Sequence, residues 1–234
     1  MPTLSQAISE RRARTVVIAL VAFVVASTFA YWGYGEYRKR ELYKAVVGHV
    51  TDASARLRDA LSIGMGAPSI DAYVTQRLED HAKEVERRFE ELRRMSAAPN
   101  RALVDAAELY MVTARELLRR TASSHRYRAT FSSSAQMLVA LTQHASGRSG
   151  SWIAQMVSAK EQAERDYSNY RGALDAIGRL LDSLPDARRK LAVHVDPAVL
   201  LEESLRANAR EQALEASQRA ADELERARQF WSRR

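Results

Sequence analysis

The sequence predicts an all-α protein, in which a single N-terminal transmembrane helix is followed by an elongated antiparallel bundle of four to five helices with coiled-coil-like seams. Three observations predict this class. Residues 15–35 contain no charged side chain. Nine glycines and five prolines are few for 234 residues, and the helix-favouring residues Ala, Leu, Arg and Glu are abundant. After residue 36, apolar residues recur at steps of three and four, which is the period of a helix face.

The uncharged run at 15–35 is about 21 residues long and, as a helix, covers roughly 30 Å, the thickness of the hydrocarbon core of a bilayer. A cleaved signal peptide is the alternative, with acceptable cleavage sites at 25–27 and 28–30. The aromatic cluster at 31–34 favours an uncleaved anchor, because such residues are typical of the lipid headgroup level. A buried core helix is disfavoured because no polar face interrupts the run.

Basic residues flank this run on both sides, with three arginines in the short tail 1–14 and a second cluster at 38–44. A short basic tail resists translocation, whereas long domains cross a membrane largely regardless of their charge. We therefore expect a bacterial inner-membrane protein with a cytoplasmic N-terminus and a periplasmic domain at 36–234. The lipid bilayer would then be a partner through residues 15–35.

Helix-ending residues divide the remainder of the chain. The first helix is expected at about 36–63 and ends in the glycine- and proline-containing segment 64–69, where Ser69 can cap the next helix. The second helix has its apolar face within 74–95. The segment "SAAPN" then breaks the chain, and Asn100 is the expected cap of the third helix.

Two apolar sets follow, at 103–121 and 127–145, separated by "TASSHRYRATFSSS". Serine and threonine hydroxyls compete for backbone hydrogen bonds, but the apolar spacing continues across the segment, which indicates a kinked or frayed helix. The segment "HASGRSGS" at 144–151 combines two glycines with three serines and predicts a turn.

The most regular pattern of the chain is a heptad seam at 153–184. Its two positions are occupied by Ile153, Lys160, Tyr167, Leu174 and Leu181, and by Met156, Ala163, Tyr170, Ile177 and Leu184. Lys160 would either set the register or extend to the edge of the seam, and Tyr167 and Tyr170 need hydrogen-bond partners if they are buried. The seam is compatible with a homodimer and equally with an intramolecular bundle.

Pro185 is expected to interrupt this helix. Asp196 and Pro197 have the residue types of a cap and a first helical position, so they are expected to open the last helix. The stripe of that helix is mostly alanine, which predicts a close neighbour. Trp231 near its end is either an aromatic docking point or the last layer of the core.

A small anion is one candidate ligand, since Arg126 and Arg128 lie beside His125 and several hydroxyl groups. This architecture is similar to that of the sensing bundles of bacterial transmembrane receptors, some of which bind carboxylates through arginines. The alternative function is therefore an extracytoplasmic ligand sensor that signals through a separate partner. The simpler alternative is that these arginines belong to a solvated helix surface and bind no ligand.

Catalytic signatures are missing from the sequence. The chain has no cysteine, which removes thiol chemistry, and it has no nucleotide-binding or HExxH motif. His49 and His81 are too few for a metal site, which usually needs three protein ligands. The net charge is +7, but acidic residues are interleaved with the basic ones, which argues against nucleic acid. We therefore expect that the protein is not an enzyme and binds no cofactor or metal. We expect a structural or protein-interaction module whose protein partners can include a second copy of the chain.

Overall fold

A computed structural model gives the fold of the chain, and it describes residues 4–64, 72–95, 99–143 and 150–232; the side chains of 4–18 and 230–232 lie outside the description. Five α-helices and one short 3-10 helix are present in these ranges, and no strand is. They are α1 (Leu4–Ser62), α2 (Ala72–Arg94), α3 (Arg101–Gln143), α4 (Gly150–Ala192), η1 (Pro197–Val199) and α5 (Glu203–Ser232).

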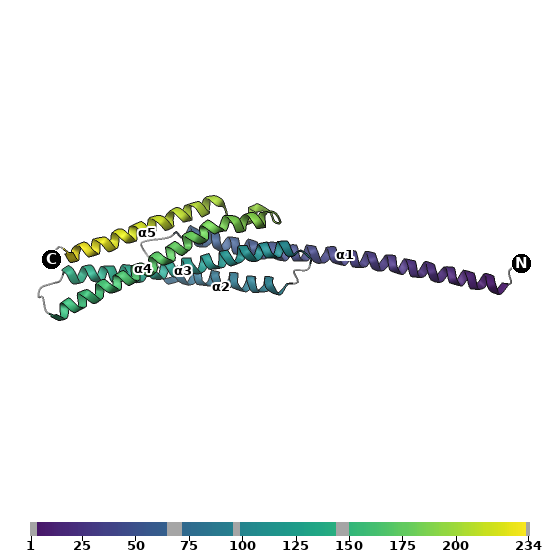
Figure 1. The fold of residues 1–234 in the computed structure, drawn as a ribbon, viewed down its shortest axis with the longest axis horizontal. Coiled ribbons are helices and arrows are strands. Elements are labelled where there is room, and N and C mark those ends of the chain that lie inside the picture. The colour runs from purple at the N-terminus through teal and green to yellow at the C-terminus, as the bar shows by residue number, and fades with distance from the viewer. Residues whose placement is uncertain (1–3, 65–71, 96–98, 144–149, 233–234) are drawn as a thin grey trace.

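The helices form a long, thin bundle in which each α-helix runs antiparallel to the next (Figure 1). α3 and α4 make the most extensive contact and form its spine. α1 and α2 pack against one half of this spine, and α5 packs mainly along α4. The N-terminal part of α1 extends away from the bundle, so the two ends of the chain lie at opposite ends of the molecule. The predicted antiparallel helical bundle is therefore confirmed.

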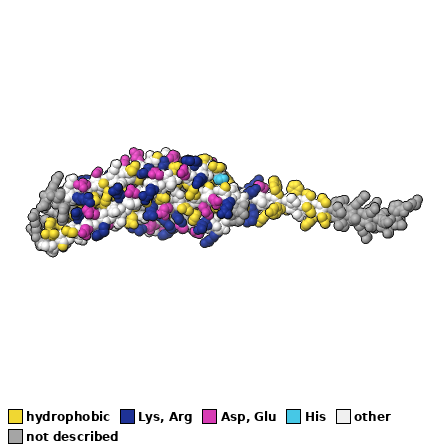
Figure 2. All heavy atoms as spheres, in the orientation of Figure 1, with side chains coloured by type: hydrophobic (Ala, Val, Ile, Leu, Met, Phe, Trp, Pro, Cys, Tyr) yellow, Lys and Arg dark blue, Asp and Glu magenta, His cyan; other side chains and the backbone are white. Residues whose placement is uncertain are grey.

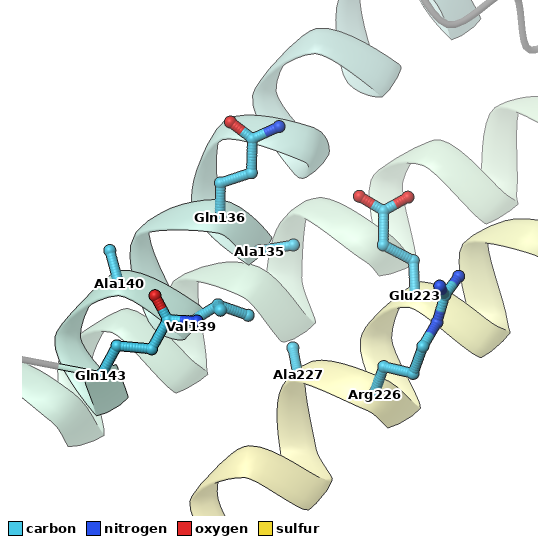
Figure 3. A pocket seen from close by; sticks show the side chains of 8 residues that line it. All are labelled: Ala135, Gln136, Val139, Ala140, Gln143, Glu223, Arg226 and Ala227. Atoms are coloured by element: carbon cyan, nitrogen blue, oxygen red, sulfur yellow. The ribbon is translucent and has the colours of Figure 1, made fainter.

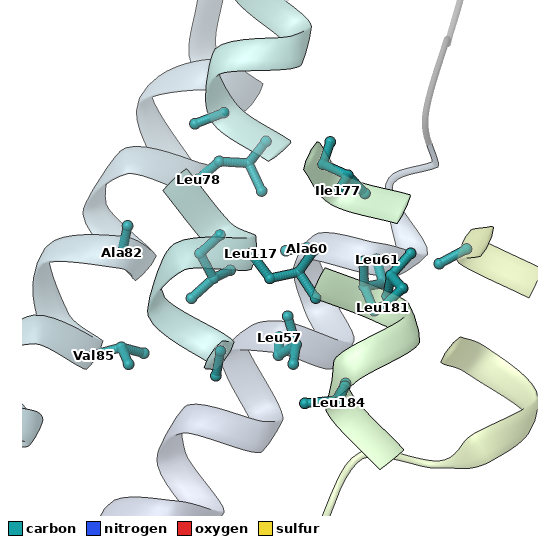
Figure 4. Close-up of a cluster of buried hydrophobic side chains, with 14 of the residues drawn as sticks. Leu57, Ala60, Leu61, Leu78, Ala82, Val85, Leu117, Ile177, Leu181 and Leu184 are labelled. Atoms are coloured by element: carbon teal, nitrogen blue, oxygen red, sulfur yellow. The ribbon is translucent and has the colours of Figure 1, made fainter. Parts of the chain in front are cut away.

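One continuous core runs through the bundle, because each helix contributes an apolar stripe. In the layer shown in Figure 4, Leu57 of α1, Leu117 of α3 and Leu181 of α4 are fully buried. Seven of the ten residues of the predicted heptad seam are buried against helices of the same chain. Ile153 at the start of the seam is half exposed. The seam thus serves mainly the interior of this bundle.

A buried tyrosine joins three parts of the chain where α5 begins. The Tyr110 hydroxyl of α3 accepts a hydrogen bond from the backbone N–H of Leu201 at 3.1 Å and lies 2.8 Å from the Ser54 hydroxyl of α1. Burial raises the pKa of Tyr110, because the phenolate would lose its hydration. The start of α5 is thereby fixed beside the last turns of α1, and α5 continues along the spine beyond the end of α1.

The predicted membrane span at 15–35 is wrong. Within the part of the chain that the structure describes, no helix is both long enough and apolar enough to cross a membrane. The described portion of this stretch includes Ser27 and Thr28 and ends in three aromatic residues with polar edges and two glycines at 31–35, which lower its mean hydropathy. The single-pass anchor and the inner-membrane placement with a periplasmic domain are corrected with it.

Two helices are more continuous than the sequence predicts. α3 runs without a break through the serine- and threonine-rich segment. Hydroxyls of this segment donate to carbonyls of the same helix, so they do not compete for its backbone N–H groups. Thr121 donates to the Leu117 carbonyl at 2.8 Å, and Ser134 to the Phe131 carbonyl at 3.0 Å. α4 likewise continues through Pro185 as far as Ala192.

The predicted caps have different outcomes. The Asn100 side chain accepts a hydrogen bond from the Leu103 N–H at 3.2 Å, which confirms it as the cap of α3. Asp196 accepts from the Ala198 N–H at 2.9 Å, but it caps η1, and α5 begins only at Glu203. The predicted cap at Ser69 and most of the predicted turn at 144–151 lie outside the described residues.

Candidate functional site

The projecting segment, which we define as residues 19–34 of α1, exposes large apolar side chains. Figure 2 shows such side chains gathered on the described part of α1 that extends away from the bundle. Nine of them are at least about half exposed: Leu20, Val21, Phe23, Val24, Val25, Phe29, Tyr31, Trp32 and Tyr34. Phe23 is 72% exposed and Phe29 is 69% exposed. The first α1 side chain that the bundle buries is Leu42. Only Tyr34, at the end of the segment, lies at a groove with residues of another described part of this chain, Met95 and Pro99.

A second feature is an open groove of about 620 Å³ between α2 and α3, which we call the basic groove. Nine residues line it: Glu79, Ala82, Lys83, Glu86 and Arg87 of α2, and Arg119, Ala122, Ser123 and Arg126 of α3. Glu86 receives one guanidinium donor from Arg115 at 3.0 Å and one from Arg119 at 2.9 Å. Arg126 forms an ion pair with Glu79. These pairs tie α2 to α3 along the groove.

The structure places the predicted anion-binding residues on different sides of α3. Arg126 is exposed and pairs with Glu79 of α2, whereas Arg128 pairs with Glu223 of α5 at 2.6 Å. His125 is buried, and burial lowers its pKa. Residues one or two positions apart on a helix do not share a face. A single small anion cannot reach both guanidinium groups from one side of α3, and of the two arginines only Arg126 lines the basic groove.

Arg128 instead completes an aromatic cluster that joins α3, α4 and α5. Its guanidinium lies 5.7 Å from the ring centre of Phe131 and 5.8 Å from that of Tyr170. Phe131 contacts Tyr167 at 5.7 Å and Tyr170 at 6.3 Å between ring centroids. Burial raises the pKa of Tyr170, although the Arg128 charge opposes this. The two seam tyrosines therefore act as packing residues in this cluster.

Two further predicted residues are placed less completely. Lys160 is half-buried and forms no ion pair with any described residue, which agrees with a lysine that extends along the edge of the seam. The side chain of Trp231 lies outside the described residues, so its predicted docking role stays a prediction.

A shallower groove of about 440 Å³ opens between α3 and α5 (Figure 3). Its floor consists of small apolar side chains, including Ala135 and Ala227, and its rim carries Gln136, Glu223 and Arg226. Glu223 is already held by Arg128. The groove is a consequence of the alanine stripe of α5, which leaves space wherever the facing side chain is also small.

His81 and His49, which the sequence singled out, connect α1 to α2 through charged partners that it did not indicate. His81 of α2 donates from Nε2 to the Asp59 carboxylate at 2.7 Å, while its Nδ1 accepts from Arg56 at 3.2 Å. His49 of α1 is buried 4.0 Å from Glu91, and burial lowers its pKa. The positions of His49 and His81 on apolar stripes indicated that both histidines lie near the core. Their partners belong to another helix, so the sequence pattern could not identify them.

The described residues do not form a recognisable catalytic or metal site. No group of three or more His, Asp or Glu side chains in the described ranges is arranged to hold a metal ion. The carboxylates of the basic groove each have an arginine partner, and the two grooves are open to solvent. No family model, curated protein or solved structure matches this chain.

Proposed function

We propose that this protein is a structural, protein-interaction module, in which a rod of antiparallel helices presents the projecting segment of α1 to a partner protein. The observation that carries the proposal is the exposure of nine large apolar side chains on that segment. Contiguous exposed apolar surface of this kind marks an interaction site, because water solvates it poorly. The partner we envisage supplies apolar helix surface, either from another protein or from a second copy.

The rest of the bundle supports such a role by its rigidity. α1 is one uninterrupted helix from Leu4 to Ser62, so the projecting segment and the core-forming part share one backbone. Val46, Val50 and Leu57 of α1 are fully buried in the bundle. A partner bound to the projecting segment would therefore be held at a fixed position relative to the bundle.

Site-specific photo-crosslinking in the full chain tests the proposal. A photoreactive residue at Phe23 or Phe29, expressed in the cells that make the protein, should yield discrete protein adducts, and the same residue at the exposed position Asn208 of α5 should not. An adduct of twice the chain mass would identify a second copy as the partner, and a different mass another protein. The absence of discrete protein adducts from both apolar positions would overturn the proposal.

A pair of substitutions provides the matched control. Phe23→Ser with Phe29→Ser should abolish an adduct formed from a photoreactive residue at Val25. The unfolding midpoint of the bundle should stay unchanged, because neither side chain is packed against it. A lost adduct accompanied by a lowered midpoint would mean that these residues act on the fold instead.

A further inference from the structure

The basic groove between α2 and α3 exposes its two signs of charge unequally. Its four cationic side chains are the outer ones, with exposed fractions of 71% for Lys83, 51% for Arg87, 51% for Arg119 and 61% for Arg126. The two lining carboxylates, Glu79 and Glu86, are only 30% and 29% exposed. Lys83 and Arg87 also pair along α2, with Asp80 and with Glu84 and Glu91, so the positive charge available to a ligand lies mainly on the α3 wall.

Two of the three arginines of the groove, Arg119 and Arg126, retain hydrogen-bonding capacity, whereas Arg87 already donates to Glu84 and Glu91 from all three of its nitrogens. A guanidinium has five N–H donors, and the bond from Arg119 to Glu86 uses one Nη2 group. Arg126 likewise contacts Glu79 through Nη2. Both arginines can bind a further carboxylate while they keep the pairs that join the two helices.

The shape of the groove favours a chain-like ligand. Ala82 and Ala122 on its floor are small, which leaves a hollow between the charged rims. Arg119 and Arg126 are seven residues apart on α3, a rise of roughly 10 Å. A single phosphate or carboxylate ion cannot reach both, whereas a peptide with several acidic side chains can. None of the nine lining residues is aromatic, so the groove offers no stacking platform for nucleic acid bases.

We propose that the basic groove is a docking surface for an acidic segment of a partner protein. It is distinct from the projecting segment of α1, so it adds a second contact surface to the function proposed above. The acidic side chains of the partner would pair with Arg119 and Arg126 of α3, and Lys83 of α2 adds a further positive charge on the opposite wall.

Fluorescence polarisation with the full chain tests this proposal. The probe is a labelled ten-residue peptide of alternating Glu and Ala, and the comparison probe has Lys in place of Glu. We expect the acidic peptide alone to bind, with an affinity that falls as salt rises. The double variant Arg119→Gln with Arg126→Gln should weaken binding by about tenfold or more, since two charge-assisted contacts are lost.

A matched control separates the groove from net charge. Arg171→Gln with Arg219→Gln removes the same charge from two exposed arginines outside the groove, which also have carboxylate partners. This variant should bind the acidic peptide within about twofold of the wild type. Circular dichroism should show the same helix content for both double variants.

Four outcomes would overturn the proposal: no binding of the acidic peptide, equal losses in the two double variants, displacement of the peptide by inorganic phosphate at similar concentration, or tighter binding of a ten-residue oligothymidine. The last two would identify a small-anion site or a nucleic acid site. None of these results would affect the crosslinking test of the projecting segment.

Discussion

At the scale of single residues, Pro185 shows how a helix breaker is accommodated inside α4. Proline has no N–H, so the carbonyl of Leu181, four residues earlier, loses its usual partner within the helix. The Arg206 side chain of α5 donates to this carbonyl at 3.1 Å from Nη1. A side chain from the next helix thus takes the place of the missing backbone donor.

We expect Arg206→Met to lower the free energy of unfolding by about 1–3 kcal/mol, because it leaves a carbonyl without a partner. In the background of Pro185→Ala, whose new N–H can donate to Leu181, the same substitution should cost clearly less. Urea unfolding of the four proteins of this double-mutant cycle measures the coupling. Additive effects of the two substitutions would show that Arg206 stabilises the chain in some other way, such as its pair with Glu203.

Buried histidines give the fold a dependence on pH. Burial lowers the pKa of both His49 and His125 below the ordinary value of 6.5. The unfolded chain then binds more protons than the folded one below about pH 6.5, so stability is complete above this value and falls as the pH drops below it. Each histidine can contribute at most about 1.4 kcal/mol per pH unit.

We expect the double variant His49→Leu with His125→Leu to lose less stability than the wild type between pH 7.5 and about pH 5.5. Urea midpoints at the two pH values measure this difference. The exposed substitution Asn208→Leu should retain the wild-type dependence. An equal pH dependence in the wild type and the histidine variant would assign the effect to other groups.

At the scale of an element, α5 packs through small side chains. Its buried stripe consists of Ala209, Ala213, Ala216, Ala220, Leu224 and Ala227. Small side chains allow helix backbones to approach closely. The sequence predicted the alanine stripe as the packed face, and the structure buries it.

Ala220→Leu should therefore destabilise the protein by about 1–3 kcal/mol, because the added carbons have no room beside a fully buried position. Ala207→Leu on the exposed face of α5 is the matched control and should change stability by less than about 0.5 kcal/mol. Thermal or urea unfolding compares the two. If both substitutions proved equally mild, the interface of α5 would have to be looser than its burial indicates.

At the scale of the whole molecule, the projecting segment belongs to the same chain as the bundle but contributes no side chain to its core. The buried residues begin at Leu42, and the projecting segment at 19–34 contributes none of them. The cooperative unfolding of the bundle should then depend on residues after about 38. Partner binding and bundle stability are separable properties in this arrangement.

A chain consisting of residues 38–234 should unfold cooperatively, with a midpoint within about 2 °C of the full chain, because no buried contact is removed. Calorimetry or circular dichroism at rising temperature measures it. A markedly lower midpoint would indicate that the projecting segment packs on the bundle in solution.

Residues of the groove and the aromatic cluster show what could be predicted about the candidate sites. The sequence singled out Arg126 and Arg128 together, since they are close along the chain. Because α3 is an unbroken helix, residues two positions apart lie on different faces of it. Arg126 therefore pairs with Glu79 of α2, and Arg128 pairs with Glu223 of α5 on another side of α3. The partners that define the basic groove come from α2, which no local pattern in α3 could indicate.

The helical class, the Asn100 cap and the heptad seam of α4 could be predicted from the sequence, because helix periodicity and capping depend on neighbours within a few residues. That α4 passes through Pro185 and that α5 starts beside Tyr110 depends on contacts between helices. The membrane span predicted at 15–35 was wrong, because no described helix is both long enough and apolar enough to cross a membrane. Donors, carboxylates and apolar partners in this bundle come from helices tens of residues away, and their positions are set only when the helices pack.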